Sequence, residues 1–87
     1  MFKEEITLQN ETGLHARPAS LFVKEAAKYK SDIKLIKDNK EYNGKSIMGI
    51  LSMGVAKGDK ITVQAEGEDE ETAVTELVDL LLNKLNN

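Results

Sequence analysis

The apolar residues of the chain follow two different spacings in turn, and this alternation limits the folds that the chain can adopt. Apolar and polar residues alternate over 2–9, 33–36 and 61–66, which is typical of strands with one buried face. Over 16–28 and 70–85 the apolar residues recur at helical spacing instead. Because such a sheet has one wet face, its helices must pack on the other face. We therefore expect a two-layer α+β domain with an antiparallel sheet.

Turn and capping residues complete the predicted order of elements. Turn residues at 38–39 allow 40–42 to return as a short third strand. Ser46 is the expected N-cap of a short helix over 47–53, and Asp69 that of the last helix. The predicted order is βαββαβα. Periodicity alone does not give the order of the strands in the sheet.

Length, charge and composition exclude several classes of protein. With 87 residues, we expect a single domain over 1–87. The longest uncharged run, 46–56, is too short to span a bilayer, and the first residues contain no apolar signal core. Cysteine is absent, so we expect a soluble cytoplasmic domain. A net charge of −3 and few aromatic residues argue against nucleic acid, so neither a membrane nor a nucleic acid is an expected partner.

The single histidine lies in a setting that suits phosphate chemistry. His15 stands between the first strand and the helix expected over 16–28. Pro18 fits the first turn of a helix but disfavours helical backbone at Arg17, so the helix begins at residue 16 or shortly after it. Unpaired amides and the positive end of the helix favour a neutral imidazole and an adjacent phosphoryl group, and Arg17 adds a fixed charge.

These features predict a histidine that accepts and releases a phosphoryl group, a reaction that depends mainly on positioning and charge. An unreactive surface or capping histidine stays open as the alternative for His15. One histidine and no cysteine exclude a multi-histidine or thiolate metal site. No second titratable group lies near His15 in the sequence, so a stand-alone enzyme is the least expected function.

Two motifs resemble the HPr family, the histidine-containing phosphocarriers of the bacterial phosphoenolpyruvate:sugar phosphotransferase system. GLHARPA at 13–19 resembles the phosphocarrier site, and KSIMG at 45–49 resembles the regulatory serine segment. Both motifs fall in the expected register, and the resemblance covers the whole chain. It implies an open-faced sandwich, with four antiparallel strands in the order 1-4-2-3 and three helices on one face.

The resemblance also implies a role for three residues. His15 would take a phosphoryl group at Nδ1 from phospho-enzyme I and pass it to an enzyme IIA domain, and Arg17 would stabilise that group. HPr kinase/phosphorylase would modify Ser46, and the phosphoserine form would bind a catabolite control repressor. The protein would be a covalent carrier with no metal or organic cofactor, and we expect a monomer.

An apolar patch for partner docking is predicted around the two motifs. Its members would be Leu14, Leu21, Ile47, Met48 and Leu51, with basic flanks at Arg17, Lys24, Lys28 and Lys45. We expect Ile47 and Met48 to be exposed and Ile50 to lie in the core. A phosphate on Ser46 would suit a helix N-terminus, but its charge beside the patch would oppose docking. The alternative is that several of these apolar residues belong to the core.

Two other functions stay open. The first is an HPr-like protein that acts only in regulation, through phospho-Ser46. Relatives of that kind lack the active histidine, whereas this chain has both His15 and Arg17. The second is a small non-catalytic module that binds RNA or protein.

Overall fold

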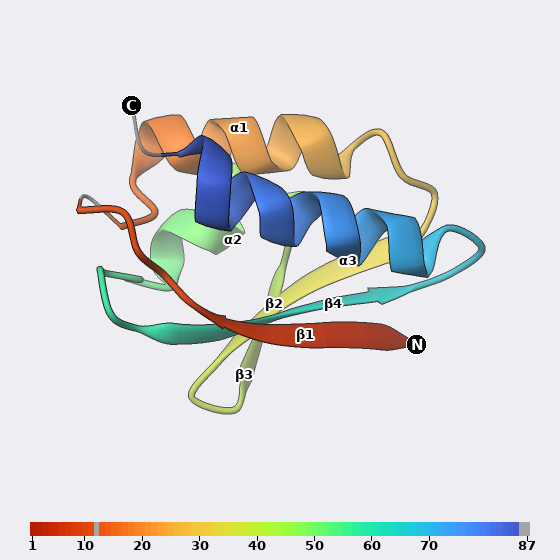
Figure 1. Ribbon diagram of the computed structural model, residues 1–87, viewed down its shortest axis with the longest axis horizontal. Helices are drawn as coiled ribbons and strands as arrows, with labels where there is room; N and C mark the ends of the chain where they lie inside the picture. Colours follow the sequence, from red (N-terminus) through yellow and green to blue (C-terminus); the bar gives the residue numbers. More distant parts are fainter. Residues whose placement is uncertain (12, 86–87) are drawn as a thin grey trace.

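One antiparallel sheet forms the lower layer of the protein (Figure 1). The computed structural model describes residues 1–11 and 13–85. The strands are β1 (Phe2–Thr7), β2 (Asp32–Lys37), β3 (Lys40–Asn43) and β4 (Lys60–Glu66). They lie in the order β1-β4-β2-β3, and neighbouring strands are antiparallel. The predicted sheet and its strand order are therefore confirmed.

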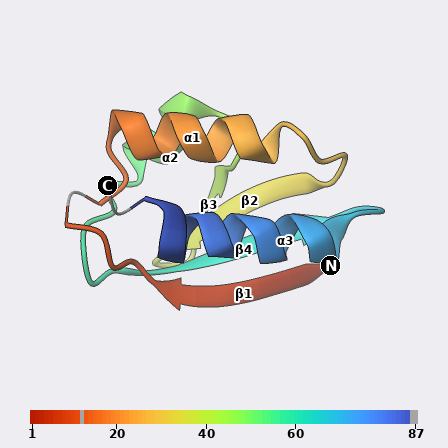
Figure 2. The same cartoon turned by 45° about the horizontal axis from the view of Figure 1, so that its top comes forward.

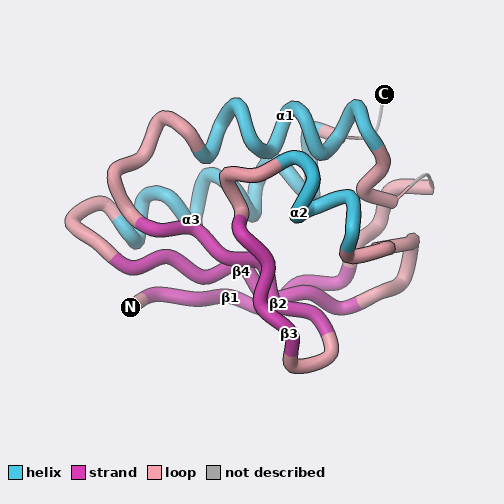
Figure 3. Tube along the Cα trace, turned by 180° about the vertical axis from the view of Figure 1, so that it is seen from behind, coloured by secondary structure: helices cyan, strands magenta, loops and turns pink. Residues whose placement is uncertain are grey.

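The helices form the upper layer, on one face of the sheet. They are α1 (Ala16–Ala26), α2 (Ile47–Ser52) and α3 (Glu70–Asp79), which continues into a π-helical turn, η1 (Leu80–Lys84). The views agree that α1 and α3 lie side by side and that α2 lies beside the N-terminal half of α1 (Figures 1 and 2). Seen from behind, the opposite face of the sheet carries no helix of the described residues (Figure 3). The element order and the open-faced sandwich are confirmed.

Two element ends differ from the sequence pattern by two residues. The first strand ends at Thr7, although Leu8 beyond it is still fully buried. The α1 helix ends at Ala26 and not at residue 28, because the next residues turn toward β2. In the part of the chain that the structure describes, no helix is both long enough and apolar enough to cross a bilayer.

The hydrophobic core lies between the two layers. β4 occupies a central position in the sheet and contributes Ile61, Val63 and Ala65 from its inner face, all nearly inaccessible. Phe22 from α1 and Leu77 from α3 pack against this face and are fully buried. Each large side chain buried in this way contributes about 1.5–3 kcal/mol, so the alternation along the strands is what holds the helices in place.

Asp69 is the N-cap of α3 by position, but its side chain does not cap the helix. Its carboxylate instead accepts hydrogen bonds from Lys30 N at 2.9 Å, from Ser31 N at 3.0 Å and from Ser31 Oγ at 2.5 Å. The predicted N-cap position is therefore confirmed, but the side chain binds the segment just before β2 and not the first turn of α3. The Ser31 hydroxyl and the backbone donors hold the pKa of Asp69 below its usual value.

This network predicts a pH-dependent stability. Because the pKa of Asp69 is lowered in the folded state, its contribution is present above the pKa of the unfolded chain and is lost as the pH falls through the folded pKa. We expect Asp69→Asn to lower the free energy of unfolding at neutral pH, and the difference from wild type to shrink below about pH 4. Urea unfolding from about pH 7 to about pH 3 measures this difference. Glu71→Gln, an exposed carboxylate of the same turn, is the control; a difference that is constant with pH contradicts the prediction.

Candidate functional site

His15 occupies the N-cap position of α1. Its backbone is extended, with φ −88° and ψ −166°, and its carbonyl accepts a hydrogen bond from Ala19 N at 2.9 Å. The imidazole makes no capping hydrogen bond to the helix, and the residue is exposed. The ring therefore stands at the mouth of α1 without being used to hold the helix together.

The first turn of α1 presents unpaired amides beside this ring. The helix begins at Ala16, so Pro18 is its third residue. The N–H groups of Ala16 and Arg17 have no partner within the helix, and Pro18 has no N–H to offer. Pro18 and Ala19 are buried, and this packing keeps Arg17 helical despite the proline that follows it. The site thus combines a ring nitrogen, two backbone donors and the positive end of a helix.

Arg17 adds a positive charge beside His15. Its side chain is exposed, and no carboxylate among the described residues lies within ion-pair distance of it. An unpaired guanidinium two residues from His15 can turn toward an anion on the ring.

Backbone hydrogen bonds between two loops set the position of His15. Leu8 N donates to Asp59 O at 2.9 Å, and Gly58 N donates to Leu8 O at 2.9 Å. Further along, Leu14 N donates to Val55 O at 3.2 Å. These loops lie at the end of the molecule where α1 begins (Figure 1). The loop after β1 is thereby fixed against the loop before β4, and it delivers the chain to the start of α1.

The prediction that Leu14 belongs to an exposed docking patch is wrong. Only 4% of Leu14 is exposed, and its side chain is part of the core. The bond from Leu14 N to Val55 O draws the backbone against the loop before β4, so the side chain points inward. Lys45 is also not a free basic flank, because its ammonium donates to Tyr29 O at 2.7 Å.

The other apolar residues of the predicted patch are on the surface. The exposed fraction is 76% for Met48 and 37–43% for Leu21, Ile47 and Leu51, whereas Ile50 is fully buried, as expected. Leu21 lies on α1 and the others on α2, two helices that pack against each other (Figure 2). We call Leu21, Ile47, Met48 and Leu51 the apolar patch. Arg17 and Lys24 are exposed on α1. Binding of partners by these residues stays a prediction.

Ser46 is the N-cap of α2, as the sequence predicts. Its Oγ accepts a hydrogen bond from Gly49 N at 3.1 Å, and the residue is half-buried. The next two residues, Ile47 and Met48, belong to the apolar patch. A charge on the Ser46 oxygen would therefore lie at the border of that patch.

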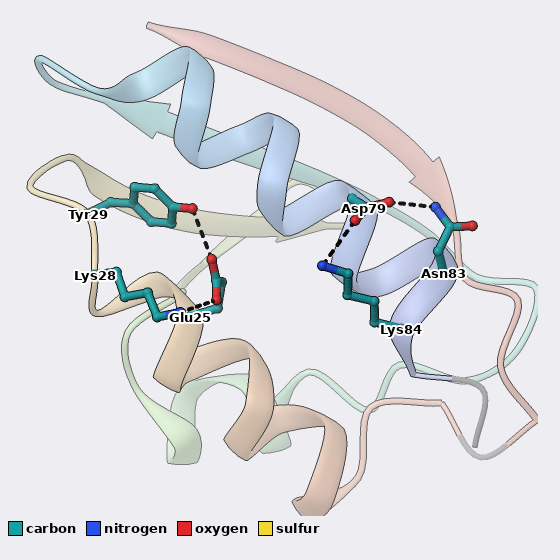
Figure 4. Close-up of polar contacts among 6 residues, drawn as sticks. All are labelled: Glu25, Lys28, Tyr29, Asp79, Asn83 and Lys84. Carbon is teal, nitrogen blue, oxygen red and sulfur yellow. Dashed lines mark hydrogen bonds and ion pairs between the residues drawn. The ribbon is translucent and has the colours of Figure 1, made fainter.

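Other polar clusters of the helical layer stabilise the helices and do not contact His15. Figure 4 shows Glu25, Lys28 and Tyr29 around the end of α1, and Asp79, Asn83 and Lys84 around η1. Glu25 accepts hydrogen bonds from Lys28 and from the Tyr29 hydroxyl, which lower its pKa. Burial and the bond to Glu25 raise the pKa of Tyr29 to about 12. Asn83 and Lys84 lower the pKa of Asp79. Neither cluster contains His15 or Arg17, so neither adds an acid or base to the site.

The site is an open surface. A cavity of about 470 Å³ is lined by residues of β2 and β3 and by Lys45, and it does not include His15. The residues that the structure describes contain no group of His, Asp and Glu side chains able to hold a metal ion. A group bound to His15 would therefore be accessible to a partner protein from outside.

Asn10 is a buried residue of the same loop that the sequence analysis did not select. Its Nδ2 donates to Gly13 O at 2.7 Å, and only 3% of the residue is exposed. The signal that could have identified it is an asparagine followed three residues later by a glycine, a pairing typical of side-chain to backbone turns.

Comparisons with known proteins agree on one family. A family model described as the PTS HPr component phosphorylation site matches residues 2–83. The HPr-like protein Crh of Bacillus subtilis (strain 168) is 47% identical over 77 residues, covering 88% of this chain and 91% of the relative. A crystal structure of HPr-C-His from Thermoanaerobacter tengcongensis has a TM-score of 0.90 and 54% identity, covering 93% of this chain and 91% of that one. A crystal structure of an HPr dimer from the same organism has a TM-score of 0.79 and 52% identity, covering both chains fully.

Two glycines with the same backbone conformation test how tightly the loop before His15 is packed. Gly13 and Gly54 both have φ +64°; a Cβ on Gly13 would overlap Val55 O, whereas a Cβ on Gly54 would meet nothing within 4 Å. We expect Gly54→Ala to destabilise the protein by about 1–2 kcal/mol, the cost of left-handed backbone. Gly13→Ala should lose about 1–3 kcal/mol more through overpacking. Urea unfolding measures both changes, and equal losses would contradict the packing of the two loops.

Proposed function

The chain belongs to the PTS HPr family, and we propose that it carries a phosphoryl group on His15 from phospho-enzyme I to enzyme IIA domains. The observation that carries this proposal is the exposed imidazole at the N-cap of α1, which makes no capping bond to its own helix. It lies next to the unpaired amides of Ala16 and Arg17. These features support the proposal, because the ring nitrogen, the amides and the positive end of the helix can all act on one phosphoryl group.

The proposed transfer moves one phosphoryl group between two imidazoles. The bond from phosphorus to nitrogen on the donor breaks as a new one forms at Nδ1 of His15. In a second exchange of the same kind, the bond at Nδ1 of His15 breaks as one forms to a histidine nitrogen of the enzyme IIA domain. The group remains anionic throughout, so the amides at the start of α1 and the guanidinium of Arg17 stabilise it. Because both bonds are of the same kind, neither transfer needs a metal or an organic cofactor on this chain.

The apolar patch supports the same proposal as a docking surface. A carrier must bind several partners and leave each of them, which requires a small interface with fast exchange. Exposed Leu21 and Met48 beside the basic Arg17 and Lys24 provide apolar contact and attraction for acidic partners. One related HPr structure is of a dimer; for this chain a monomer remains our prediction, since the patch must be free for partners.

We also propose that phosphorylation of Ser46 regulates the carrier. HPr kinase/phosphorylase would add the phosphate, and the modified chain would bind a catabolite control repressor. What supports this is the position of Ser46 Oγ at the N-cap of α2, next to the exposed Ile47 and Met48. The added charge is favourable for the helix but unfavourable for a partner that covers the patch.

A regulatory protein without carrier activity is the second candidate. The observation that favours it is the similarity to the HPr-like protein Crh of B. subtilis. His15 and the unpaired Arg17 favour the carrier, because a purely regulatory protein needs neither a reactive ring nor a free guanidinium at this helix.

Phosphorylation by enzyme I tests the carrier. We expect phosphoenolpyruvate and enzyme I to add the mass of one phosphoryl group to the wild-type chain, and acid treatment to remove it, as intact mass spectrometry can show. His15→Ala should gain no mass, whereas Ser46→Ala, the control, should be modified like wild type. Arg17→Gln should slow uptake about tenfold through loss of a charge-assisted contact. A wild-type chain that carries no phosphoryl group on His15 contradicts the proposal and favours the regulatory candidate.

Two variants of Ser46 separate its capping role from its regulatory role. Ser46→Ala removes the helix cap and should lower stability by about 1 kcal/mol, whereas Ser46→Asp keeps a capping oxygen. For phosphoryl uptake from enzyme I the order should be reversed: Ser46→Asp should be slower by at least about tenfold, because its charge must be buried under the partner. Thermal unfolding ranks the two variants by stability, and the rate of phosphoryl uptake ranks them by activity. If uptake follows stability, the regulatory proposal for Ser46 is wrong.

A further inference from the structure

Asn10 holds both polar backbone groups of Gly13, shortly before His15. The Asn10 side-chain amide donates to Gly13 O at 2.7 Å, and Gly13 N donates back to Asn10 O at 3.2 Å. The side chain is 3% exposed, so water does not compete for these bonds. Gly13 has φ +64° and no side chain to restrict its backbone conformation. These two hydrogen bonds restrict it instead.

The peptide unit between Gly13 and Leu14 is consequently held at both ends. Its carbonyl is bound by Asn10, and its N–H donates to Val55 O at 3.2 Å. A planar peptide with both ends bonded cannot rotate about its neighbours. The next residue after Leu14 is His15, whose carbonyl is fixed by Ala19 N. The path of the chain into the first turn of α1 is therefore determined by the Asn10 amide on one side and by the helix on the other.

The side-chain oxygen of Asn10 indicates that this residue does more than stabilise the fold. Asn10 Oδ1 is buried and accepts no hydrogen bond from the described residues. A buried acceptor without a donor destabilises a fold, so an asparagine here is a poor choice for packing. Within residues 1–11 and 13–85, only the donor half of the amide is used, and its acceptor is the Gly13 carbonyl.

We propose that Asn10 is a positioning residue for phosphoryl uptake: by holding the Gly13 carbonyl, it sets the His15 ring and the amides of Ala16 and Arg17 in register with each other. This inference rests on the proposed carrier function. Phosphoryl transfer depends on alignment, and a small displacement of the acceptor group is enough to slow such a step strongly. Asn10 itself is buried and acts through Gly13, without touching the phosphoryl group.

Substitutions at Asn10 test this role through a separation of kcat from KM. We expect Asn10→Ala to lower kcat for uptake from phospho-enzyme I about tenfold, with KM unchanged, because the apolar patch is intact. Asn10→Asp has the same shape but no donor, and its carboxylate faces the Gly13 oxygen, so kcat should fall further. Asn10→Ser keeps a hydroxyl donor and should lie between Ala and wild type. Gln9→Ala is the matched control in the same loop, since Gln9 is exposed and its side chain donates to Thr7 O, away from Gly13.

A packing role would give the opposite order, with Asp closer to wild type than Ala. Circular dichroism and urea unfolding establish that each variant is folded under the assay conditions; if Asn10→Ala is not, the comparison of Asn10→Ser with Gln9→Ser decides. The inference is overturned if Asn10→Ala has the kcat of wild type or if its loss is confined to KM. Where Asn10→Ala is unfolded, the same two outcomes in Asn10→Ser overturn the inference.

A spectroscopic measurement separates this inference from the carrier proposal. In the unphosphorylated protein, the ¹H–¹⁵N signals of Ala16 and Arg17 should shift in Asn10→Ala and stay in place in Gln9→Ala. If wild type accepts no phosphoryl group but these signals shift, the carrier proposal fails and the positioning of the helix start by Asn10 stands. If wild type is phosphorylated on His15 and the signals do not shift, the Asn10 inference fails by itself.

Discussion

The site depends on the hydrogen bonds between the loop after β1 and the loop before β4. β1 and β4 are neighbours in the sheet, so the end of one strand meets the start of the other. The bonds between Leu8 and the turn at Asp59 continue this pairing beyond the strands, and the bond from Leu14 to Val55 ends it directly before His15. The helix that follows therefore starts from a fixed point of the sheet. A reactive residue can lie on the surface here because its backbone is anchored in the core.

Several charged side chains of this protein bind other parts of the fold, whereas Arg17 does not do so among the described residues. The Lys37 ammonium lies 3.1 Å from Asp59 and also donates to Gly54 O, so it ties β2 to the loop before β4. Glu25 and Asp79 are bonded within their own helical segments (Figure 4). Arg17 has no such partner among the described residues, although it is next to the most electropositive point of α1. An unpaired guanidinium at this end of α1 adds nothing to stability, but it suits the binding of an anionic group that a partner brings.

Periodicity predicted the elements because burial imposes it, and it failed where one tertiary bond outweighed a local rule. The alternation in β4 and the helical spacing in α1 both reflect packing on the same core. Asp69 is the N-cap of α3 as predicted, but its side chain does not bond the helix, because it accepts hydrogen bonds from Ser31, which is distant in sequence. Leu14 was placed on the surface because it adjoins His15, and only its backbone bond to Val55 reveals the opposite. The strand order came from family resemblance, since antiparallel strands in any order satisfy the same alternation.

The N-termini of α1 and α2 border one small surface, which would allow it to serve both the proposed transfer and its proposed control. His15 begins α1 and Ser46 begins α2, and the apolar patch is built from residues of the same two helices. An oxygen of Ser46 is already bound to an amide of α2, so a phosphate added there extends an existing contact and leaves the fold intact. The charge of such a phosphate would instead oppose binding of a partner that covers the apolar patch. The imidazole of His15 makes no comparable bond to α1, so in the proposed carrier its ring nitrogen is available to a phosphoryl group.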